Sequence, residues 1–459
     1  MEKKVSPPPL KRRRLSSLEP EKRKRSLSLE SREQSDGINL RVFSWNVNGI
    51  EPFIQHIVQK PIDAFFKPRS TTASASTDKS SNIAPKADLR AFLRRQAYPT
   101  ILFLQEVKMA PTDTKAQRAV HTAINPPLSS LGTKRTLPNE DVRFDEPTYT
   151  AHFNLPTDPY NATGFGRKVY GVASLIRDDF TGKCVKRVRN VDWDAEGRIQ
   201  VIETHIPLRY SSTSPSVTDG GSLKLAIFNV YLVNGTSHPY KSSSTGEVIG
   251  TRHDRKREVH RLLQKECREM MDEGWEVLIA GDVNVARSEL DGWPRLRTSP
   301  EEHVVNRADF ERRFFEAGKG THGDVEGKDA GNDVEGGEGL DLVDSFRWMH
   351  GRRRGYTYYP RGSEWGSSCD RVDQIMLSKG LLGNSGGSCR LKQADILESS
   401  QERGPSDHVP LFVELDFGAL HTINQKMLMY LSYLKPNEIT SAMPAIPEAS
   451  KPVISLPQD

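Results

Sequence analysis

Residues 276–285 read EVLIAGDVNV. The apolar run from Glu276 to Ala280 has the length and composition of a short buried strand, and it ends at Gly281-Asp282-Val283-Asn284. Glycine followed by Asp and Asn is typical of a turn. This segment therefore places the polar side chains of Asp282 and Asn284 at the end of a strand, where a rigid sheet can hold them for chemistry.

Other apolar runs begin or end beside polar residues in the same way. The residues at these positions are Asn48, Glu106, Asn234, Asp407 and His408. Taken singly, each has an ordinary interpretation as a turn residue, a cap or a surface residue. Taken together they predict one site at the rim of a sheet. Their oxygen atoms are ligands that Mg²⁺ and Mn²⁺ prefer, and a carboxylate-rich metal site suits phosphoryl chemistry.

The pattern of apolar runs predicts the fold class. Short strands are predicted at Leu40–Trp45, Thr100–Leu104, Val169–Ile176, Ile199–Thr204, Leu223–Leu232, Glu276–Ala280, Val372–Leu377 and Val409–Leu415. Two of them, Val169–Ile176 and Ile199–Thr204, look like a pair. Helical spacing occurs at Leu89–Tyr98 and at Arg255–Glu273, the second closing before Gly274. Because strands and helices mix without a strict βαβ rhythm, we predict an α/β fold of two packed mixed sheets flanked by helices.

The charge distribution separates a basic tail from the rest of the chain. Residues 1–36 contain eleven Lys and Arg against six Asp and Glu, a net +5, which leaves 54 of each sign in the remainder. The tail is too polar to form a core, so we predict that it is disordered. Its two basic clusters, residues 11–14 and 22–25, indicate a nuclear protein that binds an import receptor; the alternative is a merely solvated tail.

The remaining organisation follows from composition. We predict a catalytic domain at residues 37–420, with insertions near 61–88, 110–148 and 317–341, and a largely disordered extension at 421–459. No run of apolar residues is long enough to cross a membrane, and the four cysteines contain no CxxC pair that would favour a zinc site. We expect a monomer without a membrane partner.

Ten short motifs give the chain a family resemblance. In chain order they are WNVNG from Trp45, LQEVK from Leu104, YGVA from Tyr170, EGR from Glu196, YLVN from Tyr231, GDVNV from Gly281, DSF from Asp344, YTYY from Tyr356, RVD from Arg371 and SDH from Ser406. The chain resembles the exonuclease III and AP endonuclease branch of the endonuclease/exonuclease/phosphatase superfamily. The resemblance implies a four-layer α/β sandwich with its site at one edge of the paired sheets.

The resemblance also implies a metal site. Glu106, with Asn48 nearby and Asp407 opposite, would hold Mg²⁺, with Mn²⁺ as a possible substitute. Three further residues belong to the expected metal environment, namely Asp282, Asn284 and His408.

The resemblance assigns catalytic roles as well. Asp282 would orient and deprotonate the attacking water, and Asn284 would bond the phosphate or the water. His408 would contact the scissile phosphate, oriented by Asp373 through its other ring nitrogen. Tyr231 would lie against the phosphate as a hydrogen-bond donor or as a phenolate. His408 has two open roles, because a protonated ring stabilises charge and a neutral ring only orients.

DNA-binding residues are implied on the same basis. Arg198 and Asn234 would grip or support the DNA backbone. The aromatic residue that precedes Arg371 in the relatives, and helps to form their sugar pocket, is Asp370 here. The pocket wall would then come from Tyr358, Tyr359 or Trp365. The chain also has Val233 and Gln374 where the relatives have Pro and Tyr.

Two basic clusters outside the tail are candidates for a DNA-facing surface. One comprises Arg252, Arg255, Lys256, Arg257 and Arg261, and the other comprises Arg352, Arg353 and Arg354. The alternative for both is ordinary solvated charge.

The expected function is therefore that of a DNA-repair AP endonuclease. It would hydrolyse the phosphodiester 5′ to an abasic site and leave a 3′-hydroxyl, with 3′–5′ exonuclease and 3′-phosphodiesterase activity on the same site. Its partner would be double-stranded DNA with abasic sites or blocked 3′ ends. The alternatives keep the chemistry and change the substrate: an RNA exonuclease, a tyrosyl-DNA phosphodiesterase or an inositol phosphatase. A non-catalytic binding protein with this fold would have lost a metal ligand or the base, and none is lost here.

Overall fold

The computed structural model describes residues 37–58, 87–125, 146–163, 168–208, 221–317, 339–383 and 389–417. The basic tail with its two targeting-like clusters and the extension from residue 421 lie outside the described residues. So do most of the three predicted insertions. The insertion near 110–148 begins with an ordered helix, Thr114–Ile124, which the sequence pattern did not predict.

The secondary structure alternates irregularly along the chain. The strands are β1 (Ile38–Asn46), β2 (Ile101–Gln105), β3 (Tyr149–Asn154), β4 (Val172–Arg177), β5 (Val185–Asn190), β6 (Ile199–Pro207), β7 (Ser222–Tyr231), β8 (Pro239–Lys241), β9 (Val248–Thr251), β10 (Glu276–Asp282), β11 (Gly292–Trp293), β12 (Val343–Asp344), β13 (Cys369–Asp370), β14 (Asp373–Leu377), β15 (Arg390–Ile396) and β16 (Leu411–Phe417). The helices are α1 (Glu51–Val58), α2 (Leu89–Arg95), α3 (Thr114–Ile124), α4 (Asp178–Cys184), α5 (Arg252–Asp272), α6 (Glu302–Phe314), α7 (Ser345–His350) and α8 (Ser400–Arg403), with 3₁₀ turns at η4 (Glu289–Asp291) and η5 (Lys379–Leu382).

Two six-stranded mixed sheets form the centre of the domain. The first has the order β15-β16-β1-β2-β4-β3, and the second has the order β12-β14-β10-β7-β6-β5. The predicted pairing of Val169–Ile176 with Ile199–Thr204 is wrong, because these segments are β4 and β6 and lie in different sheets. Strand β4 pairs with β2 and β3, whereas β6 pairs with β5 and β7. Adjacent apolar runs show which segments form strands but not which strands are neighbours.

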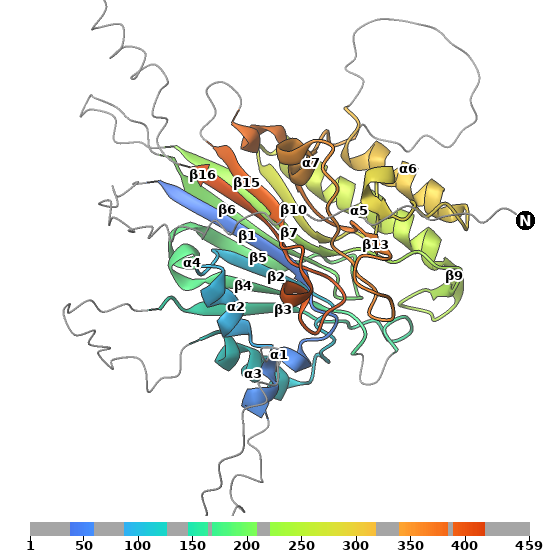
Figure 1. Ribbon diagram of the computed structural model, residues 1–459, viewed down its shortest axis with the longest axis horizontal. Helices are drawn as coiled ribbons and strands as arrows, with labels where there is room; N and C mark the ends of the chain where they lie inside the picture. The colour runs from blue at the N-terminus through green and yellow to red at the C-terminus, as the bar shows by residue number, and fades with distance from the viewer. Residues whose placement is uncertain are drawn as a thin grey trace, which may run out of the picture. The chain divides into compact units, whose positions relative to one another are not determined.

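The sheets pack face to face and helices cover their outer faces, so the predicted four-layer α/β sandwich is confirmed. One apolar cluster fills the space between the sheets, with side chains such as Val42 and Phe103 from the first meeting Ile227 and Leu278 from the second. A second cluster lies between the first sheet and α1, α2 and α3, and a third between the second sheet and α5 and α6. These two helix groups lie on opposite sides of the strands (Figure 1).

The sequence of α5 explains why this segment forms a helix of the outer layer. Its N-cap is Thr251, whose hydroxyl accepts from the backbone of Asp254 while the Asp254 carboxylate accepts from the backbone of Thr251, a capping box. Its apolar side chains, including Val259 and Leu263, face the second sheet. No helix among the described residues has the length and apolar character that a membrane crossing requires.

Strand direction brings the polar ends of the strands to one edge. β1 runs parallel to β2, and β7 runs parallel to β10. Parallel strands present their carboxyl ends at the same edge, and ligands bind there in open α/β sheets. The register places Asp282 beside Tyr231 on β7 and opposite Asp373 on β14. These three residues belong to the second sheet, and Glu106, which directly follows β2, adds the first sheet to the same site.

Candidate active site

A cavity of about 280 Å³ opens at this edge. It is lined by polar and charged side chains from segments far apart in the sequence. The lining residues are Glu106, Tyr231, Asn234, Lys256, Asp282, Asn284, Val285, Ala286, Arg297, His303, Asn306, Arg307, Tyr358, Asp370, Val372, Asp407 and His408. Most of the residues predicted from the sequence therefore lie in one place.

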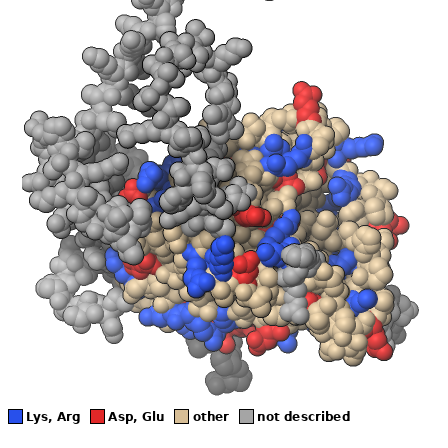
Figure 2. Space-filling view, turned by 90° about the horizontal axis from the view of Figure 1, so that it is seen from below, with Lys and Arg blue, Asp and Glu red and all other residues tan. Residues whose placement is uncertain are grey.

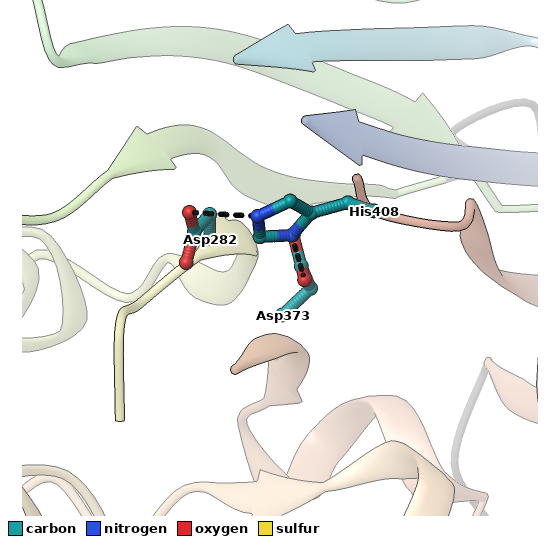
Figure 3. Close-up of side chains that lie close together, drawn as sticks. All are labelled: Asp282, Asp373 and His408. Atoms are coloured by element: carbon teal, nitrogen blue, oxygen red, sulfur yellow. Dashed lines mark hydrogen bonds and ion pairs between the residues drawn. The ribbon is translucent and has the colours of Figure 1, made fainter. Parts of the chain in front are cut away.

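His408 lies between two carboxylates (Figure 3). Its Nδ1 is 2.7 Å from Oδ2 of Asp373, and its Nε2 is 4.0 Å from Oδ2 of Asp282. All three side chains are buried. This arrangement confirms the predicted contact between Asp373 and His408, and it directs the other ring nitrogen toward Asp282 and the cavity.

Backbone and hydroxyl groups hold this trio in position. The Thr357 hydroxyl accepts from the backbone N–H groups of Val372 and Asp373 at 3.1 and 3.0 Å. The Ser406 hydroxyl donates to the Asn46 carbonyl at 2.6 Å and accepts from the backbone of His408 at 3.0 Å. Ser406 thus fastens the loop before β16 to the end of β1, which is the physical reason for the first residue of the SDH motif.

The charges of the trio follow from burial and proximity. Burial and the Asp373 carboxylate raise the pKa of the Asp282 carboxyl to about 7. Burial alone would disfavour the imidazolium, but the carboxylates of Asp373 and Asp282 outweigh it and raise the pKa of His408 to about 10. The raised pKa favours the protonated ring, the form that stabilises charge, over the neutral ring, which only orients. An Asp with an ordinary pKa near 4 is fully ionised at pH 7, whereas the raised pKa of Asp282 lies close to neutral pH.

This protonation state can be measured directly. In metal-free protein, we expect the His408 ring to show no titration between about pH 6 and 8 by NMR, whereas an ordinary histidine titrates near 6.5. The Asp373→Asn variant removes the stabilising carboxylate, so the His408 midpoint should fall below about 8. A spectrum of His408→Gln assigns the signal among the twelve histidines. A wild-type midpoint near 6.5 would contradict the assigned charge.

Glu106 lies on the opposite wall of the cavity, where it contacts Tyr231 at the end of β7 and Asn46 at the end of β1. Its Oε1 accepts from the Tyr231 hydroxyl at 2.7 Å and from Asn46 Nδ2 at 3.1 Å, and Asn46 Nδ2 also donates to Asp282 at 2.9 Å. Burial and the Glu106 carboxylate hold the pKa of the Tyr231 phenol well above its ordinary value. Of the two predicted roles for Tyr231, the structure supports the hydrogen-bond donor.

Oxygen atoms converge on a cation beside Glu106. The Lys108 ammonium is 2.9 Å from Glu106 Oε2 and also donates to Asn48 Oδ1, while Asn48 Nδ2 donates to Asp407 at 2.9 Å. Although burial opposes ionisation, the Lys108 charge lowers the pKa of Glu106. Two of the residues predicted to hold Mg²⁺, Glu106 and Asn48, thus already contact a positive charge, and Asp407 is hydrogen-bonded to Asn48. Their carboxylate and amide oxygens fit a hard divalent cation.

The trio of Asp282, Asp373 and His408 could also be considered as a metal site, since their ligand atoms lie within 4.8 Å of one another. However, Asp373 is already hydrogen-bonded to His408. A protonated imidazole has no lone pair with which to bind a metal ion. The Glu106, Asn48 and Asp407 group is therefore the better candidate for the metal ligands.

Strained backbone marks the same region. Asn48, Glu106, Lys108 and Asn284 have φ between 49° and 53°, in the left-handed region that non-glycine residues seldom adopt. Asn284 is held there because its backbone N–H donates to Asp282 and its side chain donates to the Leu232 carbonyl, both at 2.9 Å. Such conformations cost free energy and persist where surrounding contacts enforce them. Asn234 lines the cavity from an exposed position.

The structure corrects the expectation that Arg198 could grip the DNA backbone. Its side chain is 2% exposed, and its Nε donates to Glu196 at 2.8 Å. The guanidinium lies 4.7 Å from the centre of the Tyr231 ring and donates to the Tyr231 carbonyl at 3.1 Å. Arg198 therefore cannot grip DNA directly, and of its two expected roles only support remains. The EGR motif builds a buried ionic cluster behind Tyr231.

The predicted aromatic pocket wall is also only partly correct. The Tyr358 ring lies 5.0 Å from that of His408 and lines the cavity. Trp365 stacks on Tyr359 at 3.8 Å, and both line a separate cavity, so the expectation that either one walls this pocket is wrong. Asp370 takes that place, because its backbone pairs with Tyr358 across a β-bridge.

The basic cluster on α5 is not the exposed surface that its sequence suggested. Arg252 and Lys256 are buried, and Arg252 pairs with Glu196 at 2.8 Å. Arg352, Arg353 and Arg354 are exposed, which fits both a DNA-facing group and ordinary solvated charge. Lys and Arg side chains on the face in Figure 2 form separate groups, with Asp and Glu between them.

Sequence reasoning missed several residues of the site. Asn46 and Lys108 stand inside quoted motifs, and their position beside Asn48 and Glu106 was an available signal. Arg297 and Arg307 carried no such signal, because they lie in a loop and on a helix outside every motif. Tertiary packing alone brings them to the cavity.

Comparisons with known proteins identify a family for the chain. The model of the endonuclease/exonuclease/phosphatase family matches residues 43–408. The chain is similar to the catalytic domain of Xenopus laevis APE2, with 17% identity, coverage of 83% of this chain and 94% of that one, and a TM-score of 0.47. It is similar to the AP endonuclease LMAP from Leishmania major, with 16% identity, coverage of 82% and 87%, and a TM-score of 0.46. A variant of the Neisseria 3′ phosphatase NExo, bound to a product DNA hairpin, matches with 16% identity, coverage of 82% and 98%, and a TM-score of 0.43. No curated protein matches the sequence.

Proposed function

The chain belongs to the endonuclease/exonuclease/phosphatase family, and from that premise we propose that it is a magnesium-dependent DNA-repair nuclease. Its proposed reaction is hydrolysis of the phosphodiester 5′ to an abasic site, with removal of groups that block 3′ ends. The observation that carries the proposal is the cavity in which Asp282 and His408 face Glu106. A base, a charged donor and a cation site within one cavity are what hydrolysis of a phosphodiester needs.

In the proposed reaction, a water oxygen attacks phosphorus and the bond to the 3′ oxygen breaks. Asp282 takes the proton of the water, and its raised pKa suits a base that works near neutral pH. The departing 3′ oxygen takes up a proton, which yields a 3′-hydroxyl and a 5′-phosphate. Asn46 and the backbone of Asn284 each donate to the Asp282 carboxylate and so fix its orientation.

His408 and Tyr231 act on the phosphate in this scheme. The His408 imidazolium donates from Nε2 to a non-bridging oxygen, where negative charge grows during attack. Asp373 keeps the ring charged and oriented. The Tyr231 hydroxyl donates to Glu106 in the structure, and it would donate to the phosphate instead once the Glu106 carboxylate binds Mg²⁺. Mg²⁺ held by Glu106, Asn48 and Asp407 would supply further positive charge for the phosphate oxygens.

The test is nicking of a duplex that contains one abasic site. We expect cleavage 5′ to the site with Mg²⁺ and none with EDTA, followed by recovery when Mg²⁺ is restored. Glu106→Gln should raise the Mg²⁺ concentration for half-maximal rate by about tenfold or more, because one anionic ligand is lost. Glu269→Gln, on the outer end of α5, is the matched control and should behave as wild type.

A second candidate has the same chemistry on another phosphoester. Asp370, which replaces an expected aromatic at the sugar pocket, favours it. The same assay should therefore include RNA, 3′-tyrosyl DNA and phosphoinositides. Faster hydrolysis of one of these than of abasic DNA would replace the proposed substrate, while equal rates for Glu106→Gln and wild type at limiting Mg²⁺ would contradict the metal site.

A further inference from the structure

One wall of the cavity is positively charged and is not used by the mechanism above. It consists of Lys256 on α5, Arg297 in the loop before α6, and Arg307 on α6. His303 also lies on this wall. The wall adjoins Asp370, Val372 and Tyr358, the side of the cavity where the family resemblance places the sugar that follows the scissile phosphate.

These cations lack acidic partners. Within the described parts of the chain, none of the three side chains lies within 4.0 Å of a carboxylate, whereas the neighbouring Arg287 and Arg313 are each ion-paired. Arg307 is held by backbone carbonyls instead, donating to Ala286 and Arg297 at 2.7 Å each. Arg297 is exposed, whereas Arg307 is half-buried and Lys256 is buried. Charged groups that are partly removed from water, as Arg307 and Lys256 are, usually have a counter-charge.

The electrostatics show that the positive charge is not balanced. Lys256 is 3% exposed, and its hydrogen-bond partner among the described residues is the Asn284 carbonyl, at 2.7 Å. Arg307 likewise donates to carbonyl oxygens, and burial lowers the pKa of its guanidinium. An anion bound at this wall would supply the negative charge that these carbonyl groups lack.

Asp370 is the one carboxylate that the structure places next to this wall on the sugar side. Burial raises its pKa, while the charges of Arg297 and Arg307 oppose that rise, so the three groups lie close enough to interact. Glu311 and Asp291 also act on Arg307, but Glu311 is ion-paired with Arg287 and Asp291 with Arg347 and Arg371. Within the cavity, Asp370 alone leaves the two guanidinium groups with a net positive charge. A pocket of this kind is poorly suited to an uncharged sugar and well suited to a ligand that carries its own negative charge.

We propose that Arg297 and Arg307 form an anion subsite for a negatively charged group on the 3′ side of the scissile phosphate. Two substrates place an anion there: a blocked end whose terminal phosphate bears a carboxylate, as in 3′-phosphoglycolate, and a strand whose next phosphate follows an abasic sugar. The inference rests on the proposed function for the position of the scissile phosphate. It deepens that function by making charge on this group the basis of substrate choice.

Binding tests the subsite independently of catalysis. Duplexes ending in 3′-phosphoglycolate or in its uncharged amide, 3′-phosphoglycolamide, are compared by fluorescence anisotropy in EDTA. We expect the full chain to bind the glycolate end about tenfold more tightly, as one charge-assisted hydrogen bond allows. Arg297→Gln, whose side chain supports no other described residue, should remove that preference. Arg307→Gln should do the same, and Arg295→Gln, in the same loop but outside the cavity, should not.

Cleavage assays with Mg²⁺ distinguish the two possible anions, the glycolate carboxylate and the phosphate that follows an abasic sugar. If the next phosphate is the ligand, replacing the phosphate 3′ to an abasic sugar by methylphosphonate should raise KM about tenfold in wild type and leave KM of Arg297→Gln unchanged. Equal binding of the glycolate and glycolamide ends, together with no effect of methylphosphonate, would overturn the subsite. Preferential binding of the charged end without any cleavage would uphold the subsite and overturn the proposed function.

Discussion

The Asp282→Asn variant should lose about 10³- to 10⁴-fold in kcat on an abasic duplex, because the group that takes the proton from water is gone. Asn is nearly the same size, and Asp282 is buried at the end of β10, so the change removes charge with little change in volume. Asn46 donates to Oδ2 of Asp282 and the backbone of Asn284 donates to Oδ1, so the Asn variant keeps an acceptor for one of these donors and loses it for the other. Substrate affinity should still change much less than kcat.

Single-turnover kinetics at saturating enzyme measure this step, and anisotropy measures binding. Asp272→Asn is the matched control, since this exposed residue at the end of α5 makes the same chemical change far from the cavity. A loss of less than tenfold for Asp282→Asn would show that another group acts as the base. A large loss of affinity would instead indicate that Asp282 acts mainly in binding.

Gly281→Ala should destabilise the protein by about 3–5 kcal/mol, in the range caused by severe steric conflict in a core. A Cβ atom at Gly281 would lie 1.8 Å from the carbonyl oxygen of Val230 on the adjacent strand β7. Gly281 also has φ of +153°, a conformation that side chains rarely adopt. Both strands are buried in the middle of the second sheet, so neither backbone can move aside without breaking sheet hydrogen bonds.

Urea unfolding followed by circular dichroism measures this effect as a lower midpoint with an unchanged slope. Gly182→Ala is the control, because Gly182 lies in α4 and a Cβ atom there would have no neighbour within 4 Å. That variant should be as stable as wild type or slightly more stable, given the helix propensity of alanine. A Gly281→Ala midpoint within error of wild type would contradict the close approach of β10 and β7.

The charged wall has a consequence for how substrates are chosen. The reacting groups Asp282, His408 and Glu106 contact only the phosphate in the proposed reaction, which every phosphodiester shares. Discrimination must come from what lies beside them, and there the chain has Asp370, Arg297 and Arg307. Hydrogen bonds to a charged group discriminate more strongly than apolar contact, because a substrate without the matching charge leaves the half-buried Arg307 without an anionic partner.

The positions of eight strands and of the principal site residues were predictable from local sequence, whereas β3, β5, β12 and β15 of the two large sheets were not predicted. Strand β10 and the turn at Asp282 follow from an apolar run that stops at a glycine, and helix α5 follows from its periodicity and its cap. Both signals operate over a few residues, where backbone sterics and burial periodicity dominate. For the same reason Glu106, Asp407 and His408 could be placed at one rim, since each adjoins a strand end.

Tertiary structure alone decided which of these residues meet and what charge they carry. The separation of β4 from β6, the burial of Arg198 and the removal of Trp365 from the pocket depend on contacts between distant segments. So does the charge of His408, because its pKa reflects burial and two carboxylates from other strands. Local sequence reports whether a side chain is polar. Its protonation state and its neighbours arise only when the sheets pack and exclude water, since the cost of burying a charge depends on every group around it.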